Sequence, residues 1–193
     1  MRKLIIAAVL GGGLLMSGCS GANPFTAEKL PDFSGGFSST AELTYGKLTA
    51  QADIDRIEPG SWEFTFTAPE ELSGVVMTIE DGKLSASLGE ISVEDGGGDH
   101  TALPLVIAGA IDGLSGISAG ELTEKDGVLS ARSDCQGVRC TVTIDKATGD
   151  ILTVRSPSNK LSVYFSDVSP YTAASFWQAL FLPYNFPRTR TPQ

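Results

Sequence analysis

Val75-Val-Met-Thr-Ile-Glu-Asp-Gly-Lys-Leu-Ser-Ala-Ser-Leu88 is the stretch that decides the fold. Its Asp81-Gly82 pair stands between two runs of alternating apolar and polar residues, which is the strongest short-range signal for a β-hairpin with a two-residue turn. The turn also fixes the register, because a slip by one residue would move every side chain to the other face. The predicted pairs are Ile79 with Leu84, Met77 with Ala86 and Val75 with Leu88 on an apolar face, and Glu80 with Lys83 on the opposite face.

The same period of two continues upstream of this hairpin. Trp62, Phe64 and Phe66 alternate with polar residues in a run that Pro69 ends, which predicts a strand with one aromatic face. Further upstream, between residues 41 and 54, the apolar positions change from odd to even numbers at Gly46-Lys47. A glycine at such a change of phase predicts a β-bulge within one long, bent strand.

Downstream, a second Asp-Gly pair at residues 126–127 predicts another hairpin, in which Glu124 faces Leu129. Residues 138–144 alternate again, and a loop over residues 146–150 would set Ile144 against Leu152 and Val142 against Val154. A last strand carries the apolar residues Leu161, Val163 and Phe165.

One segment departs from the period of two. Apolar residues recur at helical spacing from Leu103 to Leu114, with Thr101 as a candidate N-cap and Pro104 in the first turn. The helix has almost no polar face, so we expect it to be buried. Residues 171–181 are a candidate for a second short helix. The chain therefore predicts a mainly β (α+β) domain: one curved antiparallel sheet, a half-barrel of roughly seven to nine strands, with one or two short covering helices.

The first nineteen residues carry a different signal. Arg2 and Lys3 precede a short apolar run and the small pair Ser17-Gly18, as in a signal peptide, and Cys19 follows directly. We therefore divide the chain into a signal peptide (1–18), a Gly- and Pro-containing tether that begins at the cysteine (19–37), a β domain (38–168) and an aromatic, Pro-rich C-terminal segment (169–193).

Charge excludes several classes of partner. The formal charge is −9, and removal of Arg2 and Lys3 with the signal peptide would make it −11. No cluster of Lys and Arg exists, which argues against nucleic acid and against electrostatic docking on anionic lipid. The short apolar run before Cys19 cannot span a bilayer, and no run of 18 apolar residues follows it.

Besides Cys19, which directly follows the signal peptide, the chain has two cysteines. Cys135 and Cys140 flank Gly137, and an exported protein reaches an oxidising compartment, so we expect a disulfide between them. The alternative is two free thiols on neighbouring strand positions. Their spacing is not that of a redox or zinc motif.

No residue pattern indicates catalysis. His100 is the only histidine, and it stands in a loop among glycines and aspartates where a general base could not be held in place. The acidic residues Glu94, Asp95 and Asp99 lack the spacing of a calcium-binding loop. We expect no enzyme activity, no cofactor and no metal site.

The residues before and including Cys19 resemble the lipobox of bacterial lipoproteins, with Met16 in place of the usual leucine. This resemblance implies a diacylglycerol thioether on Cys19, acyl chains such as palmitate, and an extracytoplasmic protein anchored to the cell membrane. The lipobox, the tether, the hairpins and the single helical interruption together resemble the LolA/LolB/LppX-like lipoproteins, half-barrels that take acyl chains on their concave face. The long N-terminal helix of that family has no counterpart here.

The resemblance implies binding of a lipid or another apolar ligand on the concave face. We expect the ligand to contact apolar side chains that point to that face: Trp62, Phe64, Phe66, Met77, Ile79, Val142 and Phe165. The same stripe of side chains could instead be packed core beneath a helix. In that case the protein would be an interaction or assembly module of the cell envelope without a ligand.

Overall fold

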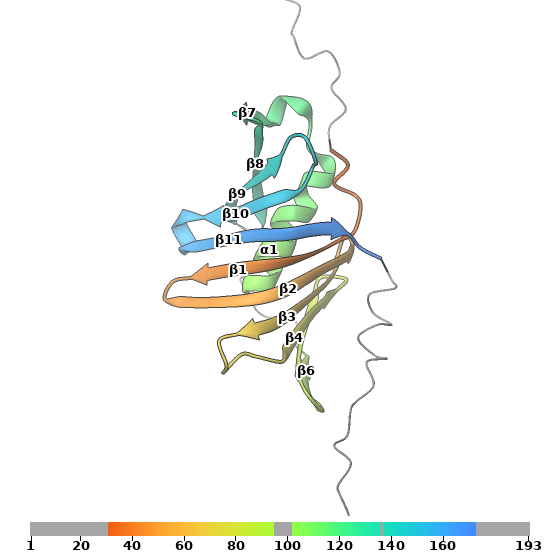
Figure 1. The fold of residues 1–193 in the computed structure, drawn as a ribbon, viewed down its shortest axis with the longest axis vertical. Coiled ribbons are helices and arrows are strands. Elements are labelled where there is room, and N and C mark those ends of the chain that lie inside the picture. Colours follow the sequence, from red (N-terminus) through yellow and green to blue (C-terminus); the bar gives the residue numbers. More distant parts are fainter. Residues whose placement is uncertain (1–30, 95–101, 136, 173–193) are drawn as a thin grey trace, which may run out of the picture.

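Eleven antiparallel strands form one open sheet in the computed structural model, which describes residues 31–94, 102–135 and 137–172 (Figure 1). The expected mainly β class with a single curved sheet is confirmed. The strands before the helix are β1 (Phe37–Tyr45), β2 (Leu48–Glu58), β3 (Ser61–Ala68), β4 (Val75–Glu80), β5 (Lys83–Leu88) and β6 (Ile91–Glu94). Those after it are β7 (Thr123–Lys125), β8 (Val128–Cys135), β9 (Val138–Asp145), β10 (Ile151–Ser156) and β11 (Leu161–Pro170).

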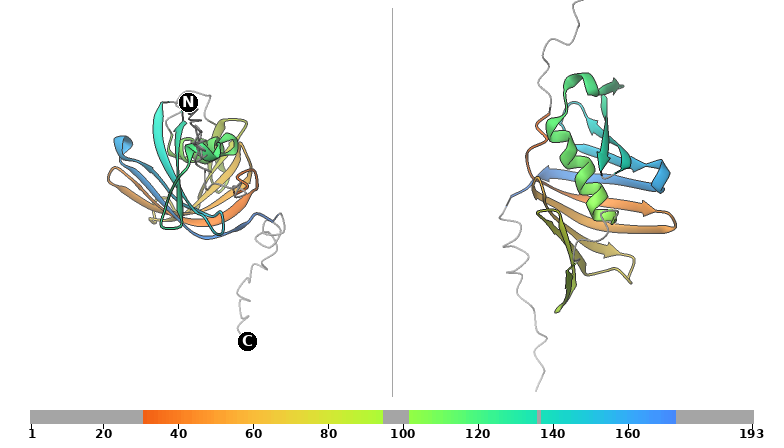
Figure 2. Two further views of the ribbon diagram at one scale, coloured as in Figure 1. Left: turned by 90° about the horizontal axis from the view of Figure 1, so that it is seen from above. Right: turned by 180° about the vertical axis from the view of Figure 1, so that it is seen from behind.

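The order of the strands explains where the helix lies. The sheet runs β6-β5-β4-β3-β2-β1-β11-β10-β9-β8-β7, so the chain moves outward from β1 to one edge and returns from the other edge to pair β11 with β1. The connection from β6 to β7 must therefore cross the sheet. It does so as α1 (Leu103–Asp112) and the 3₁₀ turns η1 (Gly113–Gly116) and η2 (Ala119–Glu121), with α1 lying across the concave face (Figure 2).

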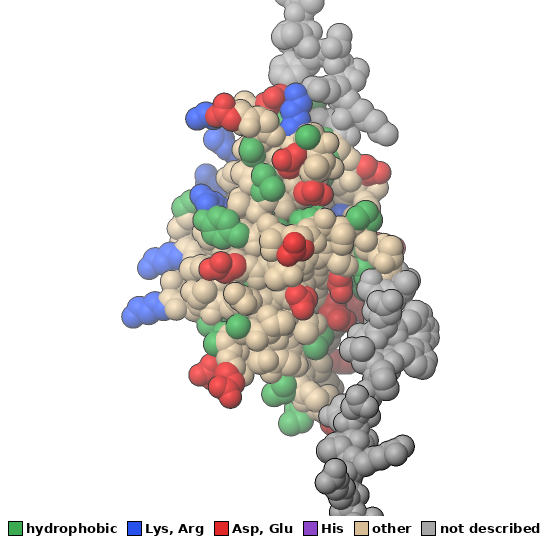
Figure 3. Space-filling model, viewed as in Figure 1, with side chains coloured by type: hydrophobic (Ala, Val, Ile, Leu, Met, Phe, Trp, Pro, Cys, Tyr) green, Lys and Arg blue, Asp and Glu red, His purple; other side chains and the backbone are tan. Residues whose placement is uncertain are grey.

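Alternation along the strands separates the two faces of the sheet. In β3, Trp62, Phe64 and Phe66 are buried while the residues between them are partly exposed, and β1, β2 and β9 repeat this pattern. The convex face is mostly polar, with hydrophobic side chains in separate patches (Figure 3). The concave face supplies the core, as expected for an antiparallel sheet that has one solvated side.

α1 approaches the sheet closely at β8. A Cβ on Gly109 would lie 2.2 Å from Sγ of Cys135, and a Cβ on Gly113 would lie 2.8 Å from Oγ of Ser133. These two glycines allow the backbone of the helical segment to rest on β8. Seven residues of α1 are buried, as its lack of a polar face predicted: Pro104, Leu105, Val106, Ile107, Ala108, Ala110 and Ile111.

The predicted bulge at Gly46-Lys47 is wrong. These residues form the turn of a hairpin in which Tyr45 pairs with Leu48, so β1 and β2 are two strands. The two residues that flank a two-residue turn lie on the same face, so such a turn also changes the apolar positions from odd to even. Gly46 has φ +63°, which suits the turn. This split, together with the short edge strand β6, makes the sheet wider than expected.

The other hairpin predictions are mostly confirmed. All four predicted pairs of the β4–β5 hairpin are present, and so is the pair Glu124–Leu129 between β7 and β8. Between β9 and β10, Val142 does face Val154. Ile144, however, faces Ile151 instead of Leu152, because the register shifts between residues 151 and 153.

The expected disulfide is also wrong, since Cys135 and Cys140 are free, buried thiols. Cys135 pairs with Val138 and Cys140 with Ser133, so the two cysteines are diagonal neighbours. Diagonal neighbours lie roughly 7–8 Å apart, beyond the usual Cα separation of a disulfide. Cys135 contacts α1 instead, with Sγ 3.5 Å from the carbonyl oxygen of Leu105. Burial raises the pKa of both thiols above its ordinary value.

One of the two predicted covering helices is present, and most of the other lies outside the described residues. The helix over residues 102–114 is confirmed as α1 and η1, with Pro104 in its first turn, but its N-cap is Ala102 and not Thr101. Residues 1–30, 95–101 and 173–193 lie outside the described residues, and with them Cys19, His100, Asp95, Asp99 and most of the second helix candidate. Pro31–Phe37, assigned above to the tether, includes Phe33, whose side chain is part of the core.

We predict that Gly109→Ala destabilises the protein by roughly 1–3 kcal/mol through overpacking against Cys135. Alanine is otherwise the better helix former, so a loss of stability identifies the steric contact. Urea unfolding of Gly109→Ala, Cys135→Ala and the double variant measures it, and the double variant should recover most of the loss. Gly116→Ala is the control, since its Cβ would meet nothing within 4 Å. Equal effects of Gly109→Ala in both backgrounds would contradict the close approach.

Candidate binding site on the concave face

The aromatic stripe predicted to bind a ligand lies in the middle of the concave face. Trp62 and Phe64 stack with ring centroids 6.0 Å apart, and Phe37 packs edge-on against Trp62 at 5.7 Å. Six of the seven predicted residues are buried, with exposed fractions of at most 8%: Trp62, Phe64, Phe66, Ile79, Val142 and Phe165. Met77 is half-buried and packs against this core.

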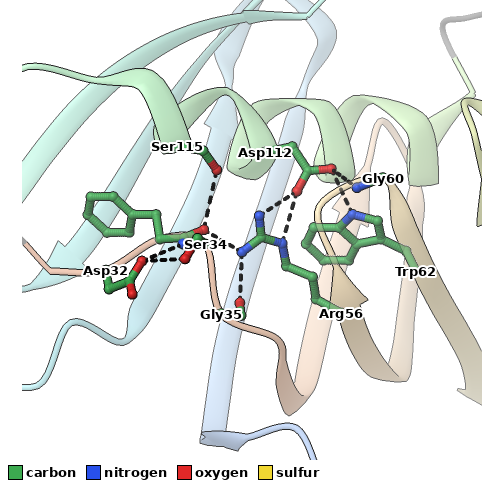
Figure 4. A network of polar contacts seen from close by, with 9 residues as sticks. Asp32, Ser34, Gly35, Arg56, Gly60, Trp62, Asp112 and Ser115 are labelled. Carbon is green, nitrogen blue, oxygen red and sulfur yellow. Dashed lines mark hydrogen bonds and ion pairs between the residues drawn. The ribbon is translucent and has the colours of Figure 1, made fainter.

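An ion pair fixes the end of α1 to the sheet. Asp112 Oδ1 accepts a hydrogen bond from Nε of Arg56 at 2.9 Å and lies 2.8 Å from its Nη2. The other carboxylate oxygen accepts hydrogen bonds from the indole Nε1–H of Trp62 at 2.9 Å and from the backbone N–H of Gly60 at 3.0 Å. Asp112 thereby connects α1 to both β2 and β3 (Figure 4).

The same guanidinium group holds the N-terminal segment of the domain. Nη1 of Arg56 donates to the carbonyl oxygens of Phe33, at 2.6 Å, and Gly35, at 2.9 Å (Figure 4). Arg56 is 1% exposed and its guanidinium lies 5.6 Å from the centre of the Trp62 ring. A planar group with five donors is suited to join three segments in this way.

Sequence reasoning missed Arg56 and Asp112, although the chain carried a signal for one of them. Between residues 48 and 54 the apolar residues occupy even-numbered positions, which indicates that the even-numbered side chains of β2 point inward. Arg56 is the next even-numbered position in this alternation. An arginine at an inward-facing position requires a buried partner. Asp112 gave no comparable signal, because the last residue of an apolar helix is an ordinary place for a polar side chain.

Towards the β6 edge the concave face remains apolar but is no longer fully covered. One row of paired residues crosses the sheet from Ile54 through Phe64, Met77 and Ala86 to Val93. Burial declines along it, from 0% exposed at Phe64 to 65% at Val93.

We call the outer part of this face the apolar wing. Its most exposed side chains are Leu88 (52%), Ile91 (71%) and Val93 (65%). Ile91 pairs with Leu88, and β6 has no second partner strand among the described residues. The wing consists of Val75, Met77, Leu84, Ala86, Leu88, Ile91 and Val93, and a contiguous apolar surface of this kind is typical of a binding site.

The predicted residues divide according to this geometry. Met77 belongs to the wing and Ile79 borders it, and Phe64 and Trp62 pair with these two residues one strand further in. Phe165 and Val142 lie beyond, on β11 and β9. Three cavities of about 350, 300 and 580 Å³ are lined entirely by described residues, and none of the seven predicted residues lines any of them.

Other kinds of site find no support in the part of the chain that the structure describes. No three His, Cys, Asp or Glu side chains there are grouped to hold a metal ion. Its helices are too short to cross a membrane. The carboxyl of Glu63 has a raised pKa, caused by partial burial and by Asp55 directly opposite on β2, but it points to the convex face.

No protein-family model matches the chain, and no curated protein matches it. Similar solved structures include an uncharacterised conserved protein from Thermus thermophilus, at 12% identity and a TM-score of 0.47, covering 82% of this chain and 89% of that one. A LolA superfamily protein from Nitrosomonas europaea has 8% identity and a TM-score of 0.37, with 76% and 90% covered. A putative outer membrane lipoprotein-sorting protein domain from Vibrio parahaemolyticus has 12% identity and a TM-score of 0.37, with 76% and 91% covered.

Two of these three structures bear LolA or lipoprotein-sorting names. All three TM-scores are below 0.5, so these likenesses say nothing of what this chain binds.

We predict that Asp112→Asn lowers the free energy of unfolding by about 3 kcal/mol, because it leaves the buried Arg56 charge without its counter-ion. The control is Glu124→Gln, which breaks the ion pair with Lys146; its partners are 35% and 29% exposed, and such pairs contribute at most about 1 kcal/mol. Urea unfolding measures both. Equal small effects in the two variants would contradict the role given to Asp112.

Proposed function

We propose that the protein is a non-catalytic lipoprotein of the cell envelope, anchored through Cys19, that binds an acyl chain on the apolar wing. The supporting observation is the exposure of Leu88, Ile91 and Val93 on a face whose inner part is hydrophobic core. Exposed apolar surface on a monomeric domain is costly unless it is used. A lipid tail laid along the wing would cover it and extend the core outward.

The energetics of such a site favour low selectivity. Each methylene group removed from water contributes roughly 0.8 kcal/mol. The affinity of the site for an acyl chain therefore depends more on the length of that acyl chain than on its chemical groups. Met77, which is half-buried, contacts the ligand directly in this proposal. The other six predicted residues are buried and form the packed floor behind the site: Trp62, Phe64, Phe66, Ile79, Val142 and Phe165.

A second candidate is an interaction module without a lipid ligand. It is favoured by the outer edge of β6, where Ile91 and Val93 lie beside backbone groups that pair with no other described strand. Such an edge can pair with a strand of another protein. β7, at the other edge, is short and carries Glu124 and Lys125, which discourage pairing.

The combined variant Ile91→Ser/Val93→Ser tests the first candidate. It should reduce binding of a long-chain lipid by at least about tenfold, because two apolar contacts are lost. Native mass spectrometry of the chain from residue 19, with Cys19→Ser to prevent acylation, measures co-purified lipid. Ile57→Ser is the matched control, since Ile57 is 43% exposed but lies on β2, outside the wing.

Two outcomes would count against lipid binding. One is protein free of lipid in repeated preparations, and the other is equal lipid retention in the wing variant and in the Ile57→Ser control. Pull-down of a strand-containing partner that is lost in the wing variant, with no lipid present, would support the interaction module.

The anchor is tested separately. Metabolic labelling with radioactive palmitate should mark the protein and fail to mark Cys19→Ala, because Cys19 is the proposed site of the thioether. The variant Cys135→Ala/Cys140→Ala keeps Cys19 and should remain labelled, since both replaced thiols are buried. Label that persists in Cys19→Ala would contradict the anchor.

A further inference from the structure

Three arginines that are far apart in the sequence come together on the convex face. Arg132 on β8 and Arg155 on β10 both pair with Thr141 of β9, one from each side. Arg139 is two positions before Thr141 on β9, so its side chain lies on the same face. All three arginines are exposed. Strand pairing creates this cluster, which is why the order of residues along the chain does not show it.

A cavity of about 580 Å³ lies beside these arginines, between the start of β9 and the 3₁₀ turn η3 (Pro157–Asn159). Its volume is within the range for ligand sites, about 300–1,000 Å³. Arg132 and Arg139 line it together with the exposed residues Thr141 and Ser158. Guanidinium and hydroxyl groups are hydrogen-bond donors, so this cavity is suited to an anion with several acceptor oxygens.

The guanidinium groups of Arg132 and Arg139 have no partner in the part of the chain that the structure describes. Asp134 is the one acidic residue that lines the cavity, and it lies opposite Arg139 in the β8–β9 ladder. Its Oδ1, however, accepts a hydrogen bond from the backbone N–H of Gly137 at 2.8 Å. Both guanidinium groups are therefore free to bind a ligand.

Most other carboxylates of the convex face are too far away to repel an anion at this cavity. Those on β1, β2 and β3 are Glu42, Asp53, Asp55 and Glu63. Most of the Lys and Arg side chains that Figure 3 shows lie along one side of this face. β9 is three strand spacings from β1, or about 14 Å. This exceeds the Debye length of roughly 8 Å at physiological ionic strength, so the net negative charge of the protein does not prevent binding here.

Two exposed lysines extend the positive charge beyond the cavity. Lys160 directly follows η3, and its carbonyl oxygen accepts a hydrogen bond from the backbone N–H of Gly46 at 3.1 Å, next to Lys47. A small anion would contact the cavity alone. A chain of anionic groups would contact the arginines and the lysines together, so the arrangement favours a polymer.

The N-terminal segment enters the domain at the opposite end of β10. A Cβ on Gly149, in the loop before β10, would lie 3.0 Å from Cβ of Pro31, whereas η3 follows β10. With the chain anchored through Cys19, as proposed above, the cavity is at the end of the domain away from the membrane. This favours a polymer outside the membrane over lipid headgroups.

We propose that this cavity binds a phosphate group of an anionic polymer, with Arg132 and Arg139 as the donors and with Lys160 and Lys47 beside the next part of the polymer. Phosphate fits better than carboxylate, because it has more acceptor oxygens that two guanidinium groups can share. This binding does not depend on the apolar wing. Only the preference for a polymer over a lipid surface rests on the proposed anchor.

Calorimetric titration with a short inorganic polyphosphate tests the arginines, in the chain from residue 19 with Cys19→Ser. Arg132→Gln/Arg139→Gln should weaken binding by at least about tenfold, because charge-assisted hydrogen bonds are lost. Lys83→Gln/Lys125→Gln is the matched control, since it changes the net charge equally at exposed residues outside the cavity. Equal effects of the two double variants, or no binding of polyphosphate to the parent protein, would overturn the proposal.

The same titration with poly-L-glutamate tests the choice of phosphate. Poly-L-glutamate of equal charge should bind at least about tenfold more weakly than polyphosphate, because each carboxylate has fewer acceptor oxygens. Equal or tighter binding of poly-L-glutamate would contradict a phosphate site.

A variant that should bind more tightly gives an independent test. Asp134→Asn removes the negative charge from the cavity and keeps the Oδ1 acceptor for Gly137, so the affinity for polyphosphate should rise several-fold. Asp145→Asn is the matched control, since Oδ1 of Asp145 accepts a backbone hydrogen bond from Ala147 at 2.8 Å in the loop at the other end of β9. No gain in Asp134→Asn, or an equal gain in both variants, would contradict the site.

Sedimentation with phosphatidylglycerol vesicles distinguishes the polymer from a lipid surface. The protein with Cys19→Ser should remain in solution, and Ile91→Ser/Val93→Ser should bind polyphosphate as the parent does even if the wing binds no lipid. Vesicle binding that Arg132→Gln/Arg139→Gln abolishes, without binding of polyphosphate, would overturn the proposal in favour of a membrane contact.

Discussion

The buried ion pair between Arg56 and Asp112 is the interaction on which the arrangement of the domain depends. It joins β2 to the end of α1, and through Trp62 and the carbonyl groups of Phe33 and Gly35 it also holds β3 and the N-terminal segment. Removing either charge would leave the other buried without compensation, which is far more costly than loss of a surface pair. The helix is therefore fixed to the sheet at this point.

Topology then determines which part of the concave face is covered. α1 links the two edge strands and crosses the sheet between them, resting on β8 through Gly109 and Gly113. The middle of the face becomes core, whereas the outer row of β5 and β6 retains exposed apolar side chains. A protein that used this sheet only as a scaffold would have little reason to place Ile91 and Val93 on that face. The proposed binding of an apolar ligand to that face would supply one.

The sequence predicted those features that local chemistry determines. Asp81-Gly82 specified a turn, a register and an apolar face at once, and all agree with the structure. Gly46-Lys47 was misread, because a bulge and a two-residue turn change the apolar phase in the same way. The disulfide between Cys135 and Cys140 was predicted only from their spacing and from the expected export of the protein. The contact of Cys135 with Leu105 depends on tertiary packing, which neither of these reveals. The pairing of Arg56 with a residue 56 positions away could not be predicted either. Apolar and polar residues alternate with the same period in the covered and in the uncovered part of the concave face. Only the path of α1 in the structure shows which apolar side chains remain exposed and form the wing.

Intermolecular nuclear Overhauser effects are the most direct test of where a ligand lies. The experiment uses methyl-labelled protein from residue 19 on, with Cys19→Ser, in the presence of a protonated long-chain phospholipid. Our account predicts contacts from the acyl methylene protons to the methyl groups of Leu88, Ile91 and Val93. Contacts to the methyl groups of Val142 and Val154, which are fully buried in the core, with none to the wing, would contradict it.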